Sequence, residues 1–247
     1  MTMGCTTPTP PLNRRRHLLL GGDLAPDDLT ALQAAARPVP VASRQLLRRR
    51  DEDRVVLLLD GTAKQHLVTA SGEEVIDALV GSGYVAGLTS VLGQCPAGTD
   101  LTSMEPVSAL SIAGRDLRHL VRTRPGVATA CLQVAVTQQA ALGAERARFA
   151  GTNVTQRVCT RLLELARGWG HIEDGGVHVA LPITQYELAA WSGASRESVA
   201  KILQGLRAAG TLTTSRRSLT VVDMRALRRA ASSGGHEPFH ELLRTSS

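Results

Sequence analysis

The side chains best suited to chemistry lie on one face of a short segment, residues 193–206 (GASRESVAKILQGL) of this 247-residue chain. Val199, Ile202, Leu203 and Leu206 recur at helical spacing, which predicts a helix with one buried stripe. The opposite face carries Arg196, Glu197, Ala200, Lys201 and Gln204. An arginine can contact guanine O6 and N7 together, and a carboxylate can accept a hydrogen bond from cytosine N4. The segment therefore has the side chains that a helix needs to read base edges in DNA.

The residues just before this segment predict a second helix and a tight turn. Thr184 and Glu187 have the spacing of a capping box, in which each side chain satisfies a backbone N–H at the start of a helix. Leu188 and Trp191 supply apolar anchors, and Gly193 can adopt the positive φ that a tight connection requires. Two helices joined by such a turn predict a helix-turn-helix.

The distribution of charge supports a polyanionic partner. The formal net charge is +6, and residues 155–230 hold 11 Lys or Arg against 6 Asp or Glu, so this segment alone has a net charge of +5. Such an excess is expected if DNA phosphates are the partner of the predicted helix pair. Aromatic residues make up only 2% of the chain, which argues against stacking on single-stranded nucleic acid.

The cysteines and the apolar runs indicate the setting of the protein. Cys5, Cys95, Cys131 and Cys159 form no CxxC pair and have no histidine at metal-ligand spacing, so unreactive thiols and no metal site are expected. No apolar run reaches 18 residues, and the first 23 residues lack the pattern of a signal peptide. These observations favour a cytoplasmic protein without membrane contact.

The amino-terminal half predicts short strands separated by glycine turns. A short helix is expected over 27–36, ended by the prolines of 37–40. Strand-like segments follow at 55–59, 62–69, 74–80 and 107–112, with turns at Asp60-Gly61 and Ser71-Gly72. This pattern favours an antiparallel β-barrel or jelly roll.

A long helical segment begins at Pro125 and reaches about Phe149. Its apolar residues near one side are Val127, Cys131, Val134, Ala141 and Phe149. The segment has few charges and would be costly to leave exposed, so we expect it to pack against a second copy of itself. The alternative is that it packs against its own barrel.

The remaining segments predict a winged domain. We expect a hinge at 153–155, with Thr155 as the cap of a helix that runs to Ala166. A loop at 168–176, with a turn at 171–174, leads to a strand at 177–181 and then to the helix pair. Wing strands at 212–214 and 219–222 and a polar tail at 232–247 complete the chain. Arg216 and Arg217 lie at the expected tip of the wing.

These residues resemble the Crp/Fnr family of bacterial transcription regulators. The resemblance is strongest through LPITQYELAAWSGASRESVAKILQGLRAAGTLTT and TVVDMRAL, and weaker through LLLDGTAKQHLVTASGEEVIDALVGSGYVAG. It implies an α+β fold with an N-terminal antiparallel β-barrel or jelly roll, a long dimerisation helix and a C-terminal winged helix-turn-helix. The implied division is a disordered tail (1–17), a cyclic-nucleotide-binding-like effector domain (18–122), the dimerisation helix and hinge (123–152), the DNA-binding domain (153–230) and a C-terminal tail (231–247).

The resemblance also implies partners and site residues. The partners are double-stranded DNA, a second copy of the chain and RNA polymerase. The residues implied to read bases are Arg196, Glu197 and Lys201, and those implied to contact phosphate are Thr184, Gln185, Ser195, Ser198, Arg216 and Arg217. For the serines, ordinary helix capping is the alternative. Lys201 replaces the arginine more usual in the family, which gives up a planar fork for a point charge.

The chain departs from the family pattern where cyclic AMP binds. Gly87 stands in place of the glutamate that accepts from the ribose, and Ala97 stands in place of the arginine that neutralises the phosphate. Leu142 and Gly143 fall where those members offer hydroxyls to adenine. Because burying a phosphate without a charged partner is expensive, cyclic AMP is not expected as an effector.

Other cofactors have little support in the sequence. Cys5 alone cannot hold an iron-sulfur centre, and haem is not expected because His17, His66 and His119 are interpreted as surface histidines. Three possibilities stay open for the barrel: another ligand such as a cyclic dinucleotide or small metabolite, a partner protein, or a scaffold without a ligand. Arg44, Arg48, Arg49 and Arg50 could form an anion site, but acidic residues follow at 51–53, which favours a surface loop of mutually neutralising charges.

Two rival functions follow from the same residues. One is a ligand-binding or protein-interaction module whose winged helix contacts a protein, which weak salt dependence of DNA binding would favour. The other is an enzyme, which is not expected because the sequence shows no Ser/His/Asp set, phosphate-cradling glycine loop or metal-spaced cluster.

Overall fold

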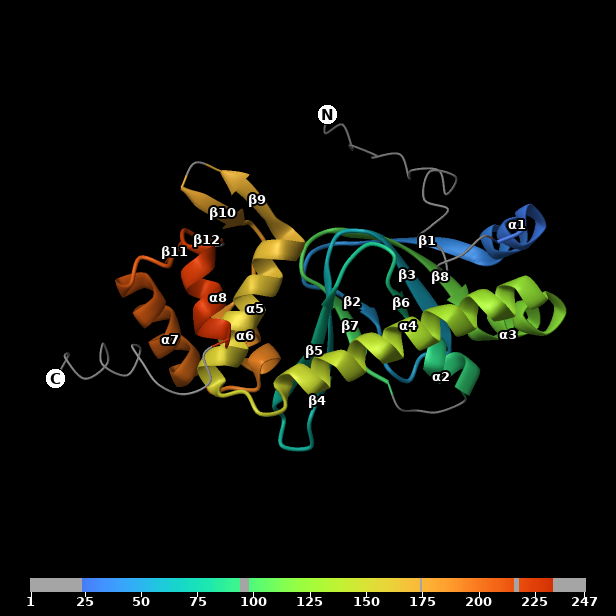
Figure 1. The fold of residues 1–247 in the computed structure, drawn as a ribbon. Helices are drawn as coiled ribbons and strands as arrows, with labels where there is room; N and C mark the ends of the chain where they lie inside the picture. The colour runs from blue at the N-terminus through green and yellow to red at the C-terminus, as the bar shows by residue number, and fades with distance from the viewer. Residues whose placement is uncertain (1–23, 94–97, 174, 216–217, 233–247) are drawn as a thin grey trace, which may run out of the picture. The chain divides into compact units, whose positions relative to one another are not determined.

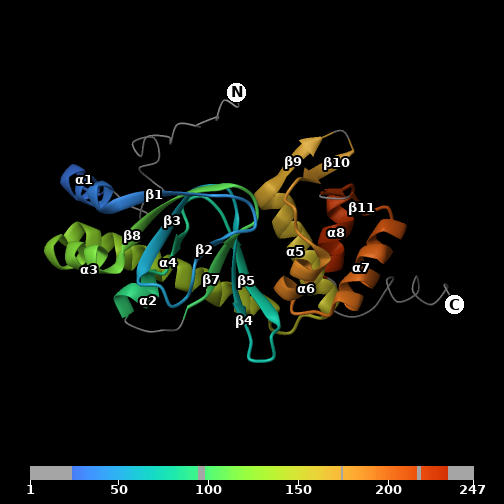
Figure 2. The ribbon, with the colours of Figure 1, turned by 180° about the vertical axis from the view of Figure 1, so that it is seen from behind.

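The computed structural model describes residues 24–93, 98–173, 175–215 and 218–232 (Figures 1 and 2). They form two compact units, of which the first takes in the chain up to residue 66 together with 79–142, and the second takes in 67–78 and 143 onward. The first unit is dominated by antiparallel sheet and the second by helices, so the predicted α+β class is confirmed.

Two four-stranded antiparallel sheets make up the β structure of the amino-terminal half. Their strand orders are β1-β8-β3-β6 and β2-β7-β4-β5. The strands are β1 (Ala36–Val41), β2 (Leu46–Arg48), β3 (Arg54–Asp60), β4 (Ala63–Val68), β5 (Glu74–Val80), β6 (Val85–Ala86), β7 (Asp100–Ser103) and β8 (Val107–Ala113). Because the chain crosses between the two sheets at every step except β4 to β5, the strands form a double-sheet jelly roll. The predicted antiparallel barrel or jelly roll is therefore confirmed.

The centre of the first sheet explains why its sequence lacks polar alternation. All five residues of the apolar run 55–59 in β3 are buried, as expected for a strand covered on both faces. The strand ends at a turn in which Gly61 has a φ of +82°, and a side chain there would collide with the backbone of Pro106. Only glycine meets both conditions without strain.

Helices cover one face of this sheet. They are α1 (Pro26–Ala35), α2 (Leu88–Gly93), α3 (Gly114–Thr123) and the first part of α4 (Pro125–Phe149). Leu29, Leu32, Leu117 and Leu120 pack into the same buried cluster as the β3 side chains. Residues 37–40 were predicted only to end a helix, whereas the structure places them in β1. Strand β1 lies at the edge of its sheet. Pro38 and Pro40 have no N–H to donate, and an edge strand tolerates this because only one of its sides pairs with another strand.

The long helix α4 corrects part of the sequence interpretation. Val127 and Cys131 are 0% and 2% exposed because they pack into the core of their own barrel, with Val134 against the same cluster. The apolar stripe assigned to a second copy is thus internal. A different ridge of α4 stays exposed, and it includes Leu132 and Val136.

Within the described residues, the second unit contains four further helices and the third antiparallel sheet, of order β11-β12-β10-β9. The helices are α5 (Val154–Trp169), α6 (Gln185–Ser192), α7 (Arg196–Ala208) and α8 (Met224–Ser232), and the strands are β9 (Gly170–Glu173), β10 (Gly176–Val179), β11 (Leu212–Thr214) and β12 (Leu219–Val221). The wing strands β11 and β12 were predicted, whereas the loop expected over 168–176 and its turn at 171–174 are wrong. Residues 170–173 pair with β10.

Helix ends in this unit differ from two other expectations. The cap of α5 is Asn153, not Thr155, because the Asn153 side chain accepts from the N–H of Gln156 while the Gln156 side chain accepts from the N–H of Asn153. Helix α8 lies partly in the segment interpreted as a tail, and it buries Leu227 completely while packing on α5. No helix in the described part of the chain has the length and apolar character needed to cross a membrane.

Candidate DNA-binding interface

The helix pair begins with a complete capping box. The Thr184 side chain accepts a hydrogen bond from the N–H of Glu187 at 3.1 Å, and the Glu187 carboxylate accepts from the Thr184 N–H at 2.9 Å. Glu187 is only 3% exposed, so the box is part of the buried structure. The predicted start of this helix is confirmed at both residues.

The turn between α6 and α7 depends on one glycine. Gly193 has a φ of +57° and a ψ of +49°, the left-handed conformation that ends helices, and the next N–H, of Ala194, donates to the carbonyl of Ala189 at 3.1 Å. The predicted positive φ is confirmed. Helix α7 then starts directly, with the Ser195 side chain accepting from the N–H of Ser198.

The two faces of α7 separate as the sequence predicts. Val199, Ile202, Leu203 and Leu206 are between 0% and 8% exposed, so the apolar stripe forms the contact with the rest of the domain. The residues on the opposite face that the structure leaves exposed are Arg196, Glu197, Lys201 and Gln204. A helix fixed along one side and free along the other can enter a major groove without losing its packing.

Arg196, Glu197 and Lys201 come together on the first two turns of this free face. Hydrogen bonds with its own backbone N–H and then with the Ser195 side chain hold the pKa of the Glu197 carboxyl below its ordinary value, and the charges of Arg196 and Lys201 act in the same direction. The carboxyl group is therefore ionised at neutral pH and acts only as an acceptor.

The candidate phosphate contacts fall into three groups. The Thr184 hydroxyl already donates to Glu187 Oε2 at 3.0 Å, and the Ser195 hydroxyl lies 3.0 Å from Ser198 Oγ, both in capping roles. Gln185 is exposed, and the structure gives its amide no hydrogen bond within the described residues, so its two N–H donors can serve a phosphate. Ser198 is partly buried and retains its own O–H donor. Arg216 and Arg217 lie outside the described residues.

Two arginines of α5 hold the helix pair, although no function was predicted for them from the sequence. Arg157 donates from Nε to the carbonyl of Ser192 at 2.8 Å and from Nη2 to the carbonyl of Gly193 at 2.9 Å. Its Nη1 donates to the carbonyl of Thr152 at 2.9 Å, just before α5. The turn that sets the angle of α7 is thus bonded to the start of α5. The sequence did not predict these contacts, because the apolar spacing of α5 indicates an amphipathic helix whose arginines face solvent.

Arg161, one turn further on, is buried with 3% of its surface exposed. Its Nε donates to the carbonyl of Trp191 at 3.1 Å, and its Nη1 donates to Glu164 Oε2 at 2.7 Å. The Cζ atom lies 4.5 Å from the ring centroids of both Phe149 and Trp191. A buried cation in contact with two aromatic rings stabilises this part of the structure strongly.

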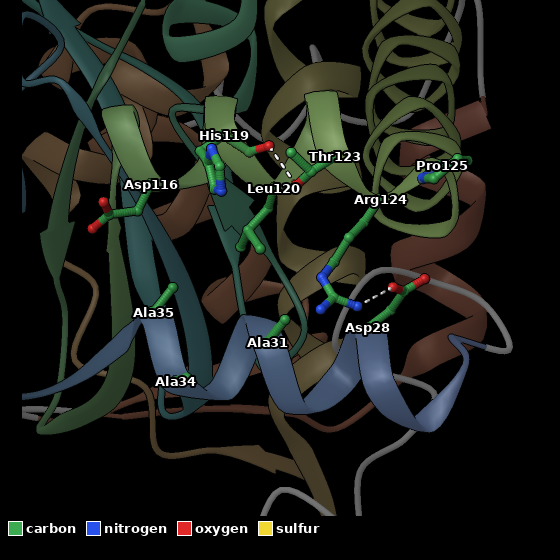
Figure 3. A pocket seen from close by; sticks show the side chains of 10 residues that line it. All are labelled: Asp28, Ala31, Ala34, Ala35, Asp116, His119, Leu120, Thr123, Arg124 and Pro125. Atoms are coloured by element: carbon green, nitrogen blue, oxygen red, sulfur yellow. Dashed lines mark hydrogen bonds and ion pairs between the residues drawn. The ribbon is translucent and has the colours of Figure 1, made fainter.

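Two hollows in the described part of the amino-terminal unit have charged side chains in their lining. The larger is an open groove of about 770 Å³ between α1 and α3. Figure 3 shows Arg124 reaching toward Asp28 on α1, where the two side chains form an ion pair at 3.1 Å. Alanines of α1 line the same wall as Asp28, and α3 lines the opposite wall. The smaller hollow, of about 180 Å³, lies beside Arg48, Gly87 and Ser90.

The expectations about cofactors can be compared with the side chains present. No group of three His, Cys, Asp or Glu suited to a metal occurs within the described ranges. Burial raises the pKa of Cys131 to about 11 and that of Cys159 to about 12, so both are neutral thiols. His119 is exposed, as predicted, whereas His66 is partly buried with Nε2 2.9 Å from Thr102 Oγ1. Cys5, Cys95 and His17 lie outside the described residues.

A jelly roll, a long helix and a winged helix-turn-helix in this order define a DNA-binding protein with a second, β-rich unit. Residues 156–230 match the Crp-like helix-turn-helix domain family. Over 208 residues the chain is 27% identical to the CRP-like cAMP-activated global transcriptional regulator of Mycobacterium tuberculosis, which spans 83% of this chain and 93% of that protein. It is also 27% identical over 177 residues to the global nitrogen regulator of Synechococcus elongatus, covering 71% and 80% of the two chains.

Solved structures show the same fold. The c-di-GMP responsive global regulator CLP of Xanthomonas campestris superposes with a TM-score of 0.69 at 18% identity, over 81% of this chain and 100% of that one. Residues 156–230 carry a Crp-like helix-turn-helix domain, and the curated relatives and the shared fold support a transcription regulator of the Crp/Fnr family. The relatives it matches are transcription regulators rather than enzymes.

Proposed function

We propose that this regulator works as a homodimer that recognises a specific duplex sequence through Arg196, Glu197 and Lys201. The observation that carries this proposal is the exposed polar face of α7 opposite a stripe that is at most 8% exposed. Arg196 would contact a guanine, Glu197 would accept from a cytosine, and Lys201 would add a weaker preference one turn on. Gln185 and Ser198 have donors for the flanking phosphates.

The exposed ridge of α4 supports the dimer. Leu132 and Val136 are 64% and 59% exposed, more than Leu46 at 49%, whereas most large aliphatic side chains in the described part of the unit are buried. Thr129 and Gln139 continue the same ridge, and both are exposed. Spacings of three and four residues alternate along these positions, which is the pattern of a seam between two helices. A two-fold dimer would place two copies of α7 on half-sites about one turn of DNA apart.

A selection experiment tests the DNA-reading roles. Random duplex DNA is selected with the full-length protein, and the enriched sites should be two-fold symmetric. Arg196→Ala should relax preference at one base pair per half-site and cost about 1–3 kcal/mol in specific binding. Gln185→Ala is the matched control, because loss of a phosphate contact should weaken all sequences alike.

Equal losses at every sequence for both variants would show that Arg196 has no part in base recognition. The rival function, a winged helix that contacts a protein, makes a different prediction. DNA binding that falls little as salt rises from low to physiological concentration would favour that rival, since phosphate neutralisation releases counterions and gives a steep slope.

The dimer has its own test. Leu132→Glu places a charge on the exposed ridge and should convert the protein to a monomer in analytical ultracentrifugation. Thr137→Glu is the control, since Thr137 is exposed on α4 but lies off the ridge. If Leu132→Glu keeps the mass of the wild-type assembly, the ridge is not the dimer seam. The domain boundaries and contact with RNA polymerase stay predictions of the family resemblance.

A further inference from the structure

The smaller hollow of the amino-terminal unit has an unusual lining for a cavity of about 180 Å³. It lies among β2, β6, α2 and one side chain of α4. The polar residues that line it are Arg48, Gln65, Tyr84, Thr89, Ser90, Thr99 and Gln138. Hydroxyl, amide and guanidinium groups therefore surround it, and no carboxylate side chain lines it within the described residues.

Arg48 is the charged group of this cavity and is only 1% exposed. Its Nε donates to the carbonyl of Arg54 at 2.8 Å, and its Nη2 donates to the carbonyl of Glu52 at 3.0 Å and to Ser90 Oγ at 2.6 Å. All three acceptors are neutral. No ion pair of Arg48 and no bond from its Nη1 occurs among the described residues. Glu52 and Asp100 attract Arg48 electrostatically, but neither forms an ion pair with it. A buried cation with no counter-ion in direct contact is costly and marks a candidate binding site.

This arrangement overturns one expectation from the sequence. Arg48 was interpreted as part of a surface loop neutralised by residues 51–53, whereas the structure buries its side chain against Gly87. The neighbouring Arg49 does fit the surface interpretation, with a side chain that is 67% exposed and 3.9 Å from Asp51.

Gly87 explains how the guanidinium fits. The residue has a φ of +83°, and any side chain built there would collide with Arg48 Nε and Cζ. By the family resemblance, this is the position of the glutamate that accepts hydrogen bonds from a ribose. The guanidinium lies in the space that such a side chain would enter, so a donor replaces an acceptor and a positive charge replaces a negative one. The residues present do not fit a cyclic nucleotide, and the cavity is smaller than the roughly 300 Å³ at which ligand pockets begin.

We infer that this cavity binds a small anion, a carboxylate or a phosphate, through the Arg48 guanidinium with the Ser90 hydroxyl beside it. A guanidinium binds both anions through paired N–H donors, and both would supply the counter-ion that Arg48 lacks. The inference rests on the proposed function, because it names the class of effector for the regulator. Gln138 connects the site to α4, since its Nε2 donates to the carbonyl of Val85 at 3.0 Å and lines the same cavity.

Thermal unfolding of the full-length protein tests the site. Inorganic phosphate, acetate and cyclic AMP are each added at matched ionic strength, with chloride as the reference. Phosphate or acetate should raise the Tm by about 2 °C or more, and the anion that does so identifies the chemistry, while cyclic AMP should leave the Tm unchanged. Arg48→Met should abolish the shift, and Arg49→Met, which removes the same charge from the adjacent exposed residue, should retain it.

A second pair of measurements keeps the test decisive if Arg48→Met does not fold. Ser90→Ala leaves the charge in place and should weaken anion binding several-fold by titration calorimetry. No Tm shift with either anion, or equal shifts in wild type and Arg48→Met, would overturn the inference. DNA binding measured without added anion separates the two proposals. Specific DNA binding together with no anion effect would contradict only the anion site. Anion binding without specific DNA binding would contradict only the proposed DNA-reading function.

Discussion

Arg161 and Trp191 are joined twice, once through the ring and once through the backbone. The guanidinium carbon lies 4.5 Å from the ring centroid, and Nε donates to the carbonyl oxygen of the same tryptophan at 3.1 Å. The same carbon also lies 4.5 Å from the centroid of the Phe149 ring. One buried side chain of α5 therefore connects the end of α4 to the helix that precedes α7. We conclude that the orientation of α7 depends on residues outside this helix.

Arg161→Met should lower the free energy of unfolding of the carboxyl-terminal unit by about 3 kcal/mol. The change removes two cation–π contacts and leaves the Trp191 carbonyl and the Glu164 carboxylate without their donor. Urea unfolding followed by tryptophan fluorescence measures the loss. Arg167→Met is the control, because Arg167 is exposed on the same helix and should change stability little. Equal losses in the two variants would contradict a special role for Arg161.

Gly193→Ala should destabilise the protein by about 1 kcal/mol through backbone conformation alone. A side chain at this position would meet nothing within 4 Å, so there is no steric clash to add. The cost comes from the φ of +57°, which alanine adopts poorly. Gly193→Asn should cost less, because asparagine tolerates the left-handed region better. A loss well above 2 kcal/mol for alanine would mean that the turn contains a contact that this geometry does not show.

The carboxyl-terminal half shows how much local chemistry can be predicted from a sequence. The capping box of Thr184, the positive φ of Gly193 and the buried stripe of α7 all follow from residue types at fixed short spacings. Each is decided within one or two helical turns. These features could be predicted because no distant residue has to be known.

The errors have a common physical cause, which is contact between residues far apart in the chain. Strand β9 is only four residues long (GHIE) and mostly exposed, so its pairing with β10 is what defines it. Arg48 looks like one of several loop charges until the chain brings Ser90 to it across 42 residues. Val127 and Cys131 could face either a barrel or a second helix, and only the folded core decides between them. The spacing of residues along the chain therefore could not predict these three features, because contacts between distant residues determine them.

The contribution of Glu197 to base preference should persist in mildly acidic solution. Hydrogen bonds with its own N–H and the Ser195 side chain keep its pKa below the ordinary carboxyl value, so the acceptor form remains as the pH falls from neutral to about 5. Preference for cytosine over other bases at the contacted position, measured by competition binding, should be the same at both pH values. Ser195→Ala should raise the pH at which the preference is lost, and an unchanged midpoint in that variant would contradict the role of Ser195.

Cys131 and Cys159 should resist alkylation until the protein unfolds. Burial raises their pKa values to about 11 and about 12, from an ordinary value of 9.0, so at neutral pH neither offers the reactive thiolate. Because the folded values lie above the unfolded one, their contribution to stability is complete below pH 9 and is lost as the pH rises toward the folded values. Iodoacetamide labelling with peptide mapping should mark both residues in urea and neither in buffer, and it separates them from Cys5 and Cys95. Rapid labelling of Cys159 in the native protein would contradict this prediction. It would mean that the carboxyl-terminal unit opens often enough to expose Cys159 on α5.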